Sequence, residues 1–167
     1  MTCFAFVQGA EHAAAVARAV ADDNARAAGL VISGATGRWA EGINGYFTAT
    51  QEKGLDGRVV YGKCGDASMC IEHFEGKWQV TTVSNKGTHE AFANVTGGCA
   101  LEACTSLVWR VHDGNSKIDQ PSVKIFTGPD AEREVSGCRM RPQQCTNHFP
   151  PSPPLPPRDA LGLCAGR

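Results

Sequence analysis

The stretch "VISGATGRWAEGINGYF", residues 31–47, separates two fold classes for this chain. Its apolar start leads into Gly34, Gly37 and Ala40, the spacing with which a turn between a strand and a helix binds the pyrophosphate of a dinucleotide. That site requires a helix after the turn, because the N–H groups at the start of the helix bind the phosphates. The segment 41–47 instead contains two glycines and an aromatic pair, which disfavour a helix. We therefore predict no dinucleotide site and no cofactor.

Short β-prone runs separated by turn signals fill residues 30–128. Each turn is a dipeptide in which glycine supplies the positive φ of a tight reversal: Asp56-Gly57, Gly65-Asp66, Glu75-Gly76 and Asp113-Gly114. The expected strands are 30–33, 45–52, 58–63, 69–75, 77–84, 90–95, 107–113 and 122–126. Parallel strands need long crossovers, and no helix is expected in this region to provide them. We predict a mainly β fold, an antiparallel meander that forms a small barrel or sandwich.

Two of these strands, 77–84 and 107–113, each carry a Trp-x-Val motif. Apolar residues alternate with polar ones in both, so one face of each strand is apolar. The tryptophans and valines of the two motifs are the best core candidates. The same alternation places His73 and His112 on the less apolar face, where we expect them to contact solvent.

Composition divides the chain into three segments. Residues 1–29 form an N-terminal extension with an alanine-rich helix, which Gly29 is expected to end. Residues 30–128 form the β-rich module. Residues 129–167 form a tail that includes "PPSPPLPP" at 150–157, where prolines remove backbone donors and favour polyproline II or disorder.

Charge and hydropathy exclude several classes of partner. Sixteen basic and 17 acidic residues give a net charge of −1, spread along the chain, so we predict no nucleic-acid partner. The chain also lacks the apolar run of about 18 residues that a membrane span needs. The N-terminus lacks the basic and apolar regions of a signal peptide. We therefore expect a soluble protein without a membrane partner, cytoplasmic by default.

A series of motifs between residues 30 and 126 keeps a characteristic order. These motifs are Ser33–Gly37, Ile43–Phe47, Gly57–Lys63, Met69–Phe74, Trp78–Val80, Cys99 with Cys104, Trp109–Gly114 and Gln120–Val123. The series resembles an uncharacterised β-rich module that recurs, often as repeats, in predicted proteins of algae and oomycete-type protists. The chain departs from that pattern at Cys70, where an apolar aromatic is usual, and at Ala49, where proline is usual. The resemblance implies a β-rich fold and assigns no activity.

Aromatic residues and an arginine gather around the glycine-rich stretch. Trp39, Tyr46, Arg58 and Tyr61 are of the types that dominate binding hot spots. The alternative is that Tyr46 and Tyr61 pair across adjacent strands and cover the core. No catalytic signature is present, so we predict a non-catalytic module that contacts a protein or a glycan through these four residues.

Four cysteines within the β-rich region suggest a different function. Cys64 and Cys70 lie six residues apart across an expected hairpin, and Cys99 and Cys104 lie five apart. Each pair could form a disulfide or remain as free thiols. The four could also bind zinc, with His73 or His89 in place of one of them, which would make the chain a small zinc- or thiol-dependent protein or enzyme. Neither pair has the two-residue spacing of a zinc knuckle, so we favour the module without a metal.

Overall fold

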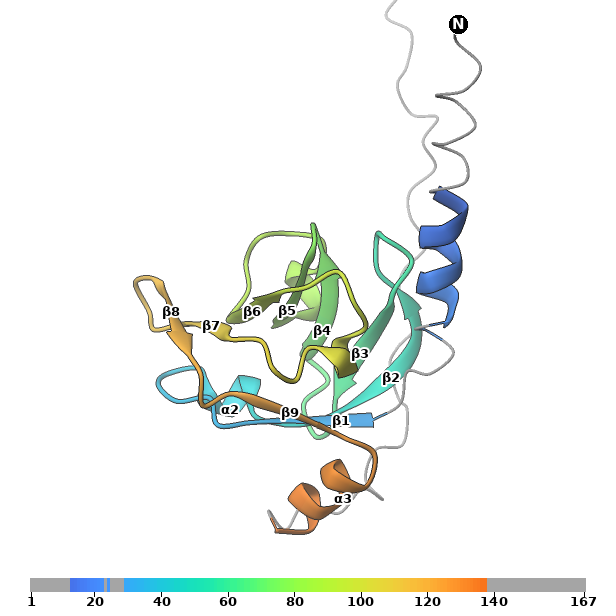
Figure 1. The fold of residues 1–167 in the computed structure, drawn as a ribbon. Helices are drawn as coiled ribbons and strands as arrows, with labels where there is room; N and C mark the ends of the chain where they lie inside the picture. The colour runs from blue at the N-terminus through green and yellow to red at the C-terminus, as the bar shows by residue number, and fades with distance from the viewer. Residues whose placement is uncertain (1–12, 23, 25–28, 138–167) are drawn as a thin grey trace, which may run out of the picture.

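The computed structural model describes residues 13–22, 24 and 29–137. In this part of the chain nine strands form one antiparallel sheet in the order β8-β7-β6-β5-β4-β3-β2-β1-β9, which curls into half a barrel (Figure 1). The strands are β1 (Gly29–Ser33), β2 (Gly45–Lys53), β3 (Val59–Lys63), β4 (Met69–Phe74), β5 (Lys77–Thr82), β6 (Ala93–Thr96), β7 (Trp109–His112), β8 (Lys117–Gln120) and β9 (Lys124–Thr127). The predicted mainly β, antiparallel fold is confirmed.

The stretch 31–47 forms an antiparallel unit. β1 pairs with β2, with Val31 opposite Tyr46, so the sheet is not a parallel dinucleotide-binding sheet. One turn of helix, α2 (Ala40–Ile43), does form between them, contrary to the expectation of no helix. It forms because Asn44 donates its backbone N–H to the carbonyl of Ala40, and it ends there as the chain turns into β2.

Gly29 has a different role from the one predicted. The expected helix is present at 13–22, but Gly29 is the first residue of β1 rather than a helix end. A Cβ on Gly29 would lie 1.9 Å from Oη of Tyr46 on the neighbouring strand. Glycine is therefore required for the close approach of the Tyr46 ring.

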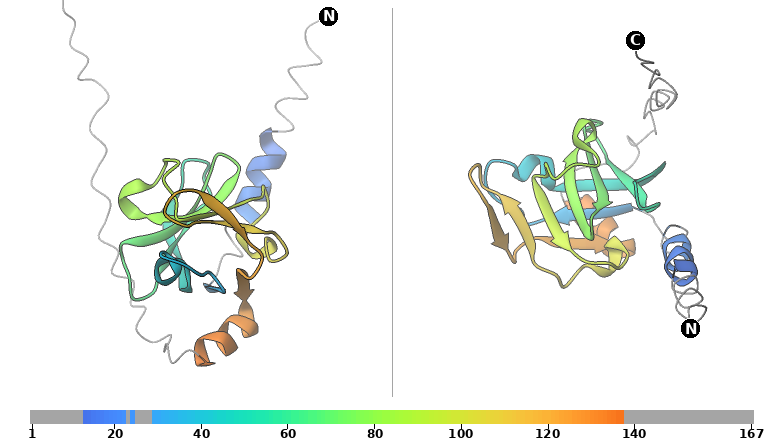
Figure 2. Two further views of the ribbon diagram at one scale, coloured as in Figure 1. Left: turned by 90° about the vertical axis from the view of Figure 1, so that its left-hand side faces the viewer. Right: turned by 90° about the horizontal axis from the view of Figure 1, so that it is seen from above.

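Three residues join the two edges of the sheet. β8 and β9 lie at opposite ends of the strand order, yet only residues 121–123 connect them. Such a link spans at most about 14 Å, so the sheet must curl until its edges are close. Side chains hold this joint: Gln120 accepts from the Thr36 N–H at 2.9 Å, and Ser122 Oγ donates to the Gly34 carbonyl at 2.8 Å. The curl is visible in the left view of Figure 2.

The inner face of the curled sheet holds the core, and part of its outer face is also covered. Trp78, Val80, Trp109 and Val111 belong to the core, as predicted. On the outer face of β4 and β5, the segment 83–92, which begins with η1 (Val83–Asn85), covers polar side chains. Three hydrogen bonds hold this segment on the sheet. Gln79 Nε2 donates to the Thr88 carbonyl, the Gly87 N–H donates to Glu72 Oε1, and Thr81 Oγ1 donates to the Glu90 carbonyl.

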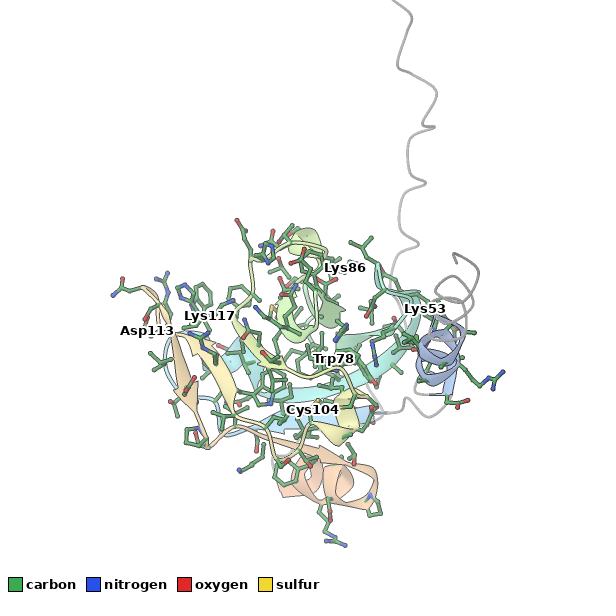
Figure 3. All side chains as sticks on the ribbon, turned by 45° about the horizontal axis from the view of Figure 1, so that its top comes forward. Lys53, Trp78, Lys86, Cys104, Asp113 and Lys117 are labelled. Carbon is green, nitrogen blue, oxygen red and sulfur yellow. The ribbon has the colours of Figure 1, made fainter. Side chains whose placement is uncertain are left out.

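The two ends of the half-barrel differ. The segment 97–108, with the short helix η2 (Leu101–Ala103), closes one end, and both Leu101 and Cys104 are fully buried there. Figure 3 shows Trp78 and Cys104 inside the fold, with Asp113 and Lys117 away from them on the β7–β8 hairpin. That hairpin, α2 and the segment 83–92 surround the opposite end.

Regular structure continues past residue 128, beyond which the composition predicted a proline-rich tail. α3 (Gly128–Gly137) packs against the outer face of the sheet, with Ala131 buried against Val31 and with Tyr46 and Phe126 beside them. The remaining tail, 138–167, lies outside the described residues. None of the described helices is both long and apolar enough to cross a membrane.

Gly34 and Gly37 give a matched test of the joint between the sheet edges. Both have positive φ, but a Cβ on Gly34 would lie 2.1 Å from the Ser122 carbonyl oxygen, whereas one on Gly37 would meet nothing within 4 Å. We expect Gly37→Ala to cost about 1–2 kcal/mol from backbone strain alone. Gly34→Ala should cost about 3 kcal/mol or more, because the joint must also shift. Urea unfolding measures both, and equal costs would contradict the proposed closure.

Candidate functional site

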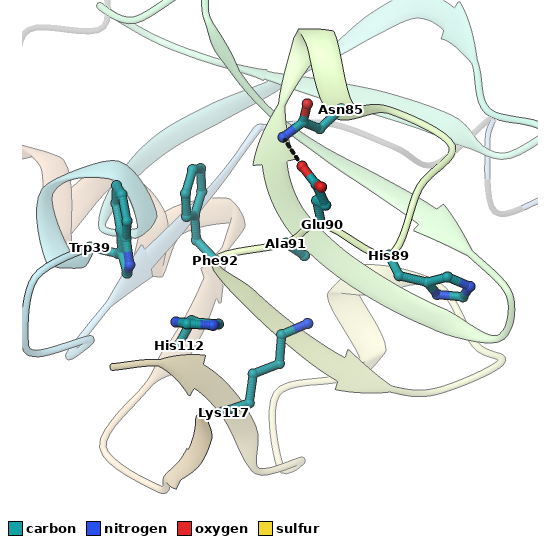
Figure 4. Close-up of a pocket in the computed structure, with 8 residues that line it drawn as sticks. All are labelled: Trp39, Asn85, His89, Glu90, Ala91, Phe92, His112 and Lys117. Carbon is teal, nitrogen blue, oxygen red and sulfur yellow. Dashed lines mark hydrogen bonds between the residues drawn. The ribbon is translucent and has the colours of Figure 1, made fainter. Parts of the chain in front are cut away.

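A pocket of about 450 Å³ lies at the open end of the half-barrel (Figure 4). It is lined by residues from the β1–β2 connection, the segment 83–92 and the β7–β8 hairpin: Trp39, Asn85, His89, Glu90, Ala91, Phe92, His112 and Lys117. Elements distant in sequence therefore meet here because the sheet curls.

Two aromatic rings form the apolar wall of this pocket. The rings of Trp39 and Phe92 lie 4.5 Å apart between centroids, and both side chains are partly buried against the core. The Arg38 guanidinium lies 4.9 Å from the centroid of the Trp39 ring. Phe92 is fixed by its backbone, which donates to Val80 and accepts from His112. The wall is thus rigidly supported yet partly exposed.

The β7–β8 hairpin contributes two polar side chains. His112 and Lys117 are opposite each other in the ladder, flanking the predicted Asp113-Gly114 turn. The Gly114 N–H donates to His112 Nδ1 at 3.0 Å, so in the neutral ring Nε2 carries the proton and acts as a donor. In Figure 4 both side chains lie below the aromatic wall. Lys117 was not among the predicted site residues, although its place across the turn from His112 indicated that the two side chains are close.

Asp113 holds the tight turn of this hairpin. Its Oδ1 accepts from the N–H groups of Asn115 and Ser116 at 2.8 and 2.9 Å. These hydrogen bonds lower the pKa of Asp113. The support they give is present at neutral pH and is lost as the pH falls through that lowered pKa.

The charge of Lys117 is disfavoured in the folded chain. Burial lowers the pKa of Lys117, and the positive charges of Lys77 and Arg110 lower it further. Asp119, on the same hairpin, lies 3.5 Å from Arg110 and pairs with it instead. An anion near Lys117 would favour its charged form.

On the opposite side of the pocket lies a carboxylate. Asn85 Nδ2 donates to Glu90 Oε2 at 3.1 Å, as Figure 4 shows, and this bond orients the carboxylate. The pocket therefore offers donors on the β7–β8 hairpin and an acceptor on the segment 83–92.

The structure separates the four residues predicted to bind a partner. Only Trp39 lines the pocket. Tyr46 lies on the outer face beside α3, whereas Tyr61 belongs to the inner core, so these two do not pair across strands. Arg58 and Tyr61 are 8% and 2% exposed, which leaves little surface for a partner.

Arg58 and Tyr61 hold the segment that closes the other end. Arg58 donates to the carbonyl of Gly98 at 2.7 Å, and the Tyr61 hydroxyl donates to Glu102 at 2.7 Å. His73 is 7% exposed and contacts Asp56 and the Gly97 carbonyl, so the expectation that it faces solvent was wrong. These groups are buried because the segment 97–108 folds over them.

The cysteines do not gather into one cluster. Cys70 is a buried free thiol and Cys64 is disulfide-bonded, so of the alternatives left open for this pair a Cys64–Cys70 disulfide does not form. Cys99 and Cys104 are free thiols in contact, not a disulfide. The described residues contain no group of three or more His, Cys, Asp or Glu side chains arranged to hold a metal.

Comparison of the chain with protein-family models, with curated proteins and with solved structures found no match. The resemblance to a repeat module of algal and protist proteins therefore stays a prediction.

The role of Arg58 at the closed end can be tested by its removal. Arg58→Met removes the charged donor and leaves the carbonyls of Gly98 and Cys99 with one partner fewer. We expect a loss of about 1.5–3 kcal/mol in the free energy of unfolding. Arg133→Met, at an exposed arginine on α3, should change it by less than about 0.5 kcal/mol. Denaturant titration compares the two variants, and a similarly small effect at Arg58 would refute the assigned role.

Proposed function

We propose that this chain is a non-catalytic recognition module whose open-end pocket binds a sugar unit of a glycan. The observation that carries the proposal is the partly exposed pair Trp39 and Phe92, 4.5 Å apart, next to polar side chains on two sides. Aromatic faces carry negative potential, which suits stacking against the C–H bonds of a sugar ring. Pockets that combine an apolar wall with a few placed polar groups are typical ligand sites.

The polar groups of the pocket match the hydroxyls of a sugar. The Nε2 side of His112 and the ammonium of Lys117 supply donors, and the carboxylate of Glu90 supplies an acceptor. A hydroxyl both donates and accepts, so a ring with several hydroxyls can use both sides of the pocket.

Lys117 favours a sugar that carries a negative substituent. Its charge is disfavoured by burial and by Lys77 and Arg110, and a carboxylate or sulfate would offset that cost. Arg38, stacked on Trp39, adds a second cation close to the pocket. Uronic-acid and sulfated glycans are therefore expected to bind more tightly than neutral ones.

The composition of the pocket supports binding rather than hydrolysis. Most glycoside hydrolases use two carboxylates on either side of the scissile bond. Glu90 is the one carboxylate among the eight residues that line this pocket. A bound glycan would therefore be retained without cleavage.

A glycan array containing neutral, uronic-acid and sulfated oligosaccharides tests this function. We expect binding to the acidic glycans and a loss of about tenfold or more in affinity for Trp39→Ala, which removes the stacking surface. Lys117→Met should lower affinity for acidic glycans selectively. Lys124→Met, at an exposed lysine of β9 outside the pocket, is the matched control and should bind as the unsubstituted chain does.

The free energy of unfolding of Lys117→Met shows whether weaker binding comes from the loss of a ligand contact or from the loss of the fold. Because burial and the charges of Lys77 and Arg110 lower the pKa of Lys117, its charge is disfavoured in the folded state, so Lys117→Met should leave the free energy of unfolding unchanged or raise it. Weaker acidic-glycan binding without lower stability supports the proposal. A blank array, or equal binding by Trp39→Ala, would refute it.

A further inference from the structure

Two thiols are in contact at the closed end of the half-barrel. Cys99 Sγ and Cys104 Sγ lie 3.4 Å apart, and a disulfide needs about 2.05 Å, so a small shift would join them. Cys99 is exposed, whereas Cys104 is fully buried beneath the segment 97–108. One sulfur is therefore accessible to a reagent and the other is held behind it.

The folded scaffold keeps the two sulfurs together. Trp78 Nε1 donates to the Cys99 carbonyl at 2.9 Å, and Leu101, between the cysteines, is fully buried. A Cβ on Gly97 would lie 3.1 Å from Cys104 Sγ and 3.7 Å from Cys99 Sγ, so the backbone of Gly97 lies directly against both sulfurs. Positioning of this kind raises the effective concentration of one thiol near the other.

We infer that Cys99 and Cys104 form a redox-active pair, which closes to a reversible disulfide by exchange with a low-molecular-weight disulfide of the glutathione type. The Cys99 thiol loses its proton and attacks one sulfur of the small disulfide; that S–S bond breaks and one small thiolate leaves. Cys104 then loses its proton and attacks the Cys99 sulfur, which expels the second small thiolate. The two released thiolates take up the two protons, so two protein thiols are oxidised and one small disulfide is reduced to two thiols.

The environments of the cysteines set the order of these steps. Burial, followed by the neighbouring Cys99 thiol, raises the pKa of Cys104 to about 12. Burial likewise raises the pKa of Cys70 to about 12. Since the thiolate is the nucleophile, Cys99 reacts first with a soluble reagent, and Cys104 reacts only with the sulfur next to it. Cys70 serves as an internal control that stays reduced.

The full chain, equilibrated in buffers of reduced and oxidised glutathione, tests the inference. Samples are quenched with acid, alkylated, and the peptide that contains residues 99 and 104 is analysed by mass spectrometry. We expect a loss of two hydrogen atoms from this peptide in oxidising buffer, reversed by excess reduced glutathione. The oxidised protein should also unfold at a temperature about 5 °C higher, because the cross-link restrains the unfolded chain.

Three variants separate the steps. Cys104→Ser should accumulate glutathione on Cys99, because the second thiol is missing, and Cys99→Ser should leave Cys104 unmodified. Cys70→Ser, the matched control, should form the same disulfide as the unsubstituted chain. If Cys104→Ser fails to fold, the Cys99→Ser and Cys70→Ser pair still tests which residue accepts the reagent. Stable glutathione on Cys99 of the unsubstituted chain, or two thiols unchanged in every buffer, would overturn the inference.

Discussion

The short link between β8 and β9 determines the shape of the whole sheet. These strands are the two edges of the sheet, and three residues must connect them. A flat sheet of nine strands would place its edges far apart, since neighbouring strands lie about 4.8 Å from each other. The sheet therefore curls, and its curl creates an inner face for the core and two ends that the loops must close or leave open.

The two ends of the half-barrel differ in the side chains that line them. At the closed end, the segment 97–108 brings backbone carbonyls into the fold, and the side chains of Arg58, Trp78 and His73 contact them. Every buried side-chain nitrogen and oxygen of the described residues has a hydrogen-bond partner, so this polar packing leaves no such atom unsatisfied. At the open end, an aromatic pair and the partly desolvated charge of Lys117 remain accessible. We propose that an acidic ligand offsets the disfavoured charge of Lys117.

Local sequence signals predicted the meander well because each hairpin depends on a short turn. Glycines with positive φ occur at Gly57, Gly65, Gly76 and Gly114, as the dipeptides indicated. β8 was missed because only its last residue, Gln120, is buried, so it lacks an apolar alternation. α3 was also missed, although Pro129 near its start is a favourable residue for the first turn of a helix.

The candidate site was harder to predict because it depends on contacts between distant segments. Arg58 and Tyr61 are residue types that are common in binding surfaces, but the segment 97–108, about 40 residues later in the chain, covers them. The same covering buries His73, which alternation alone placed in solvent. Of the four residues predicted to bind a partner, Trp39 lines the pocket, and the ring beside it, Phe92, comes from a loop more than 50 residues away. The sequence pattern identifies aromatic and charged residues of the right types, but the curl of the sheet determines which of these residues come into contact.

The three tryptophans allow glycan binding at the open end to be measured by NMR. Trp39 lines the pocket, Trp78 donates a hydrogen bond to the Cys99 carbonyl at the closed end, and Trp109 is buried in the core. Their indole N–H signals in a ¹H–¹⁵N NMR spectrum report on the three places separately. Addition of an acidic oligosaccharide, such as an oligogalacturonate or a sulfated glycan, should shift the Trp39 signal and leave those of Trp78 and Trp109 in place. No shift at Trp39 with any acidic probe, or a shift confined to Trp78, would show that the open end does not bind an acidic glycan.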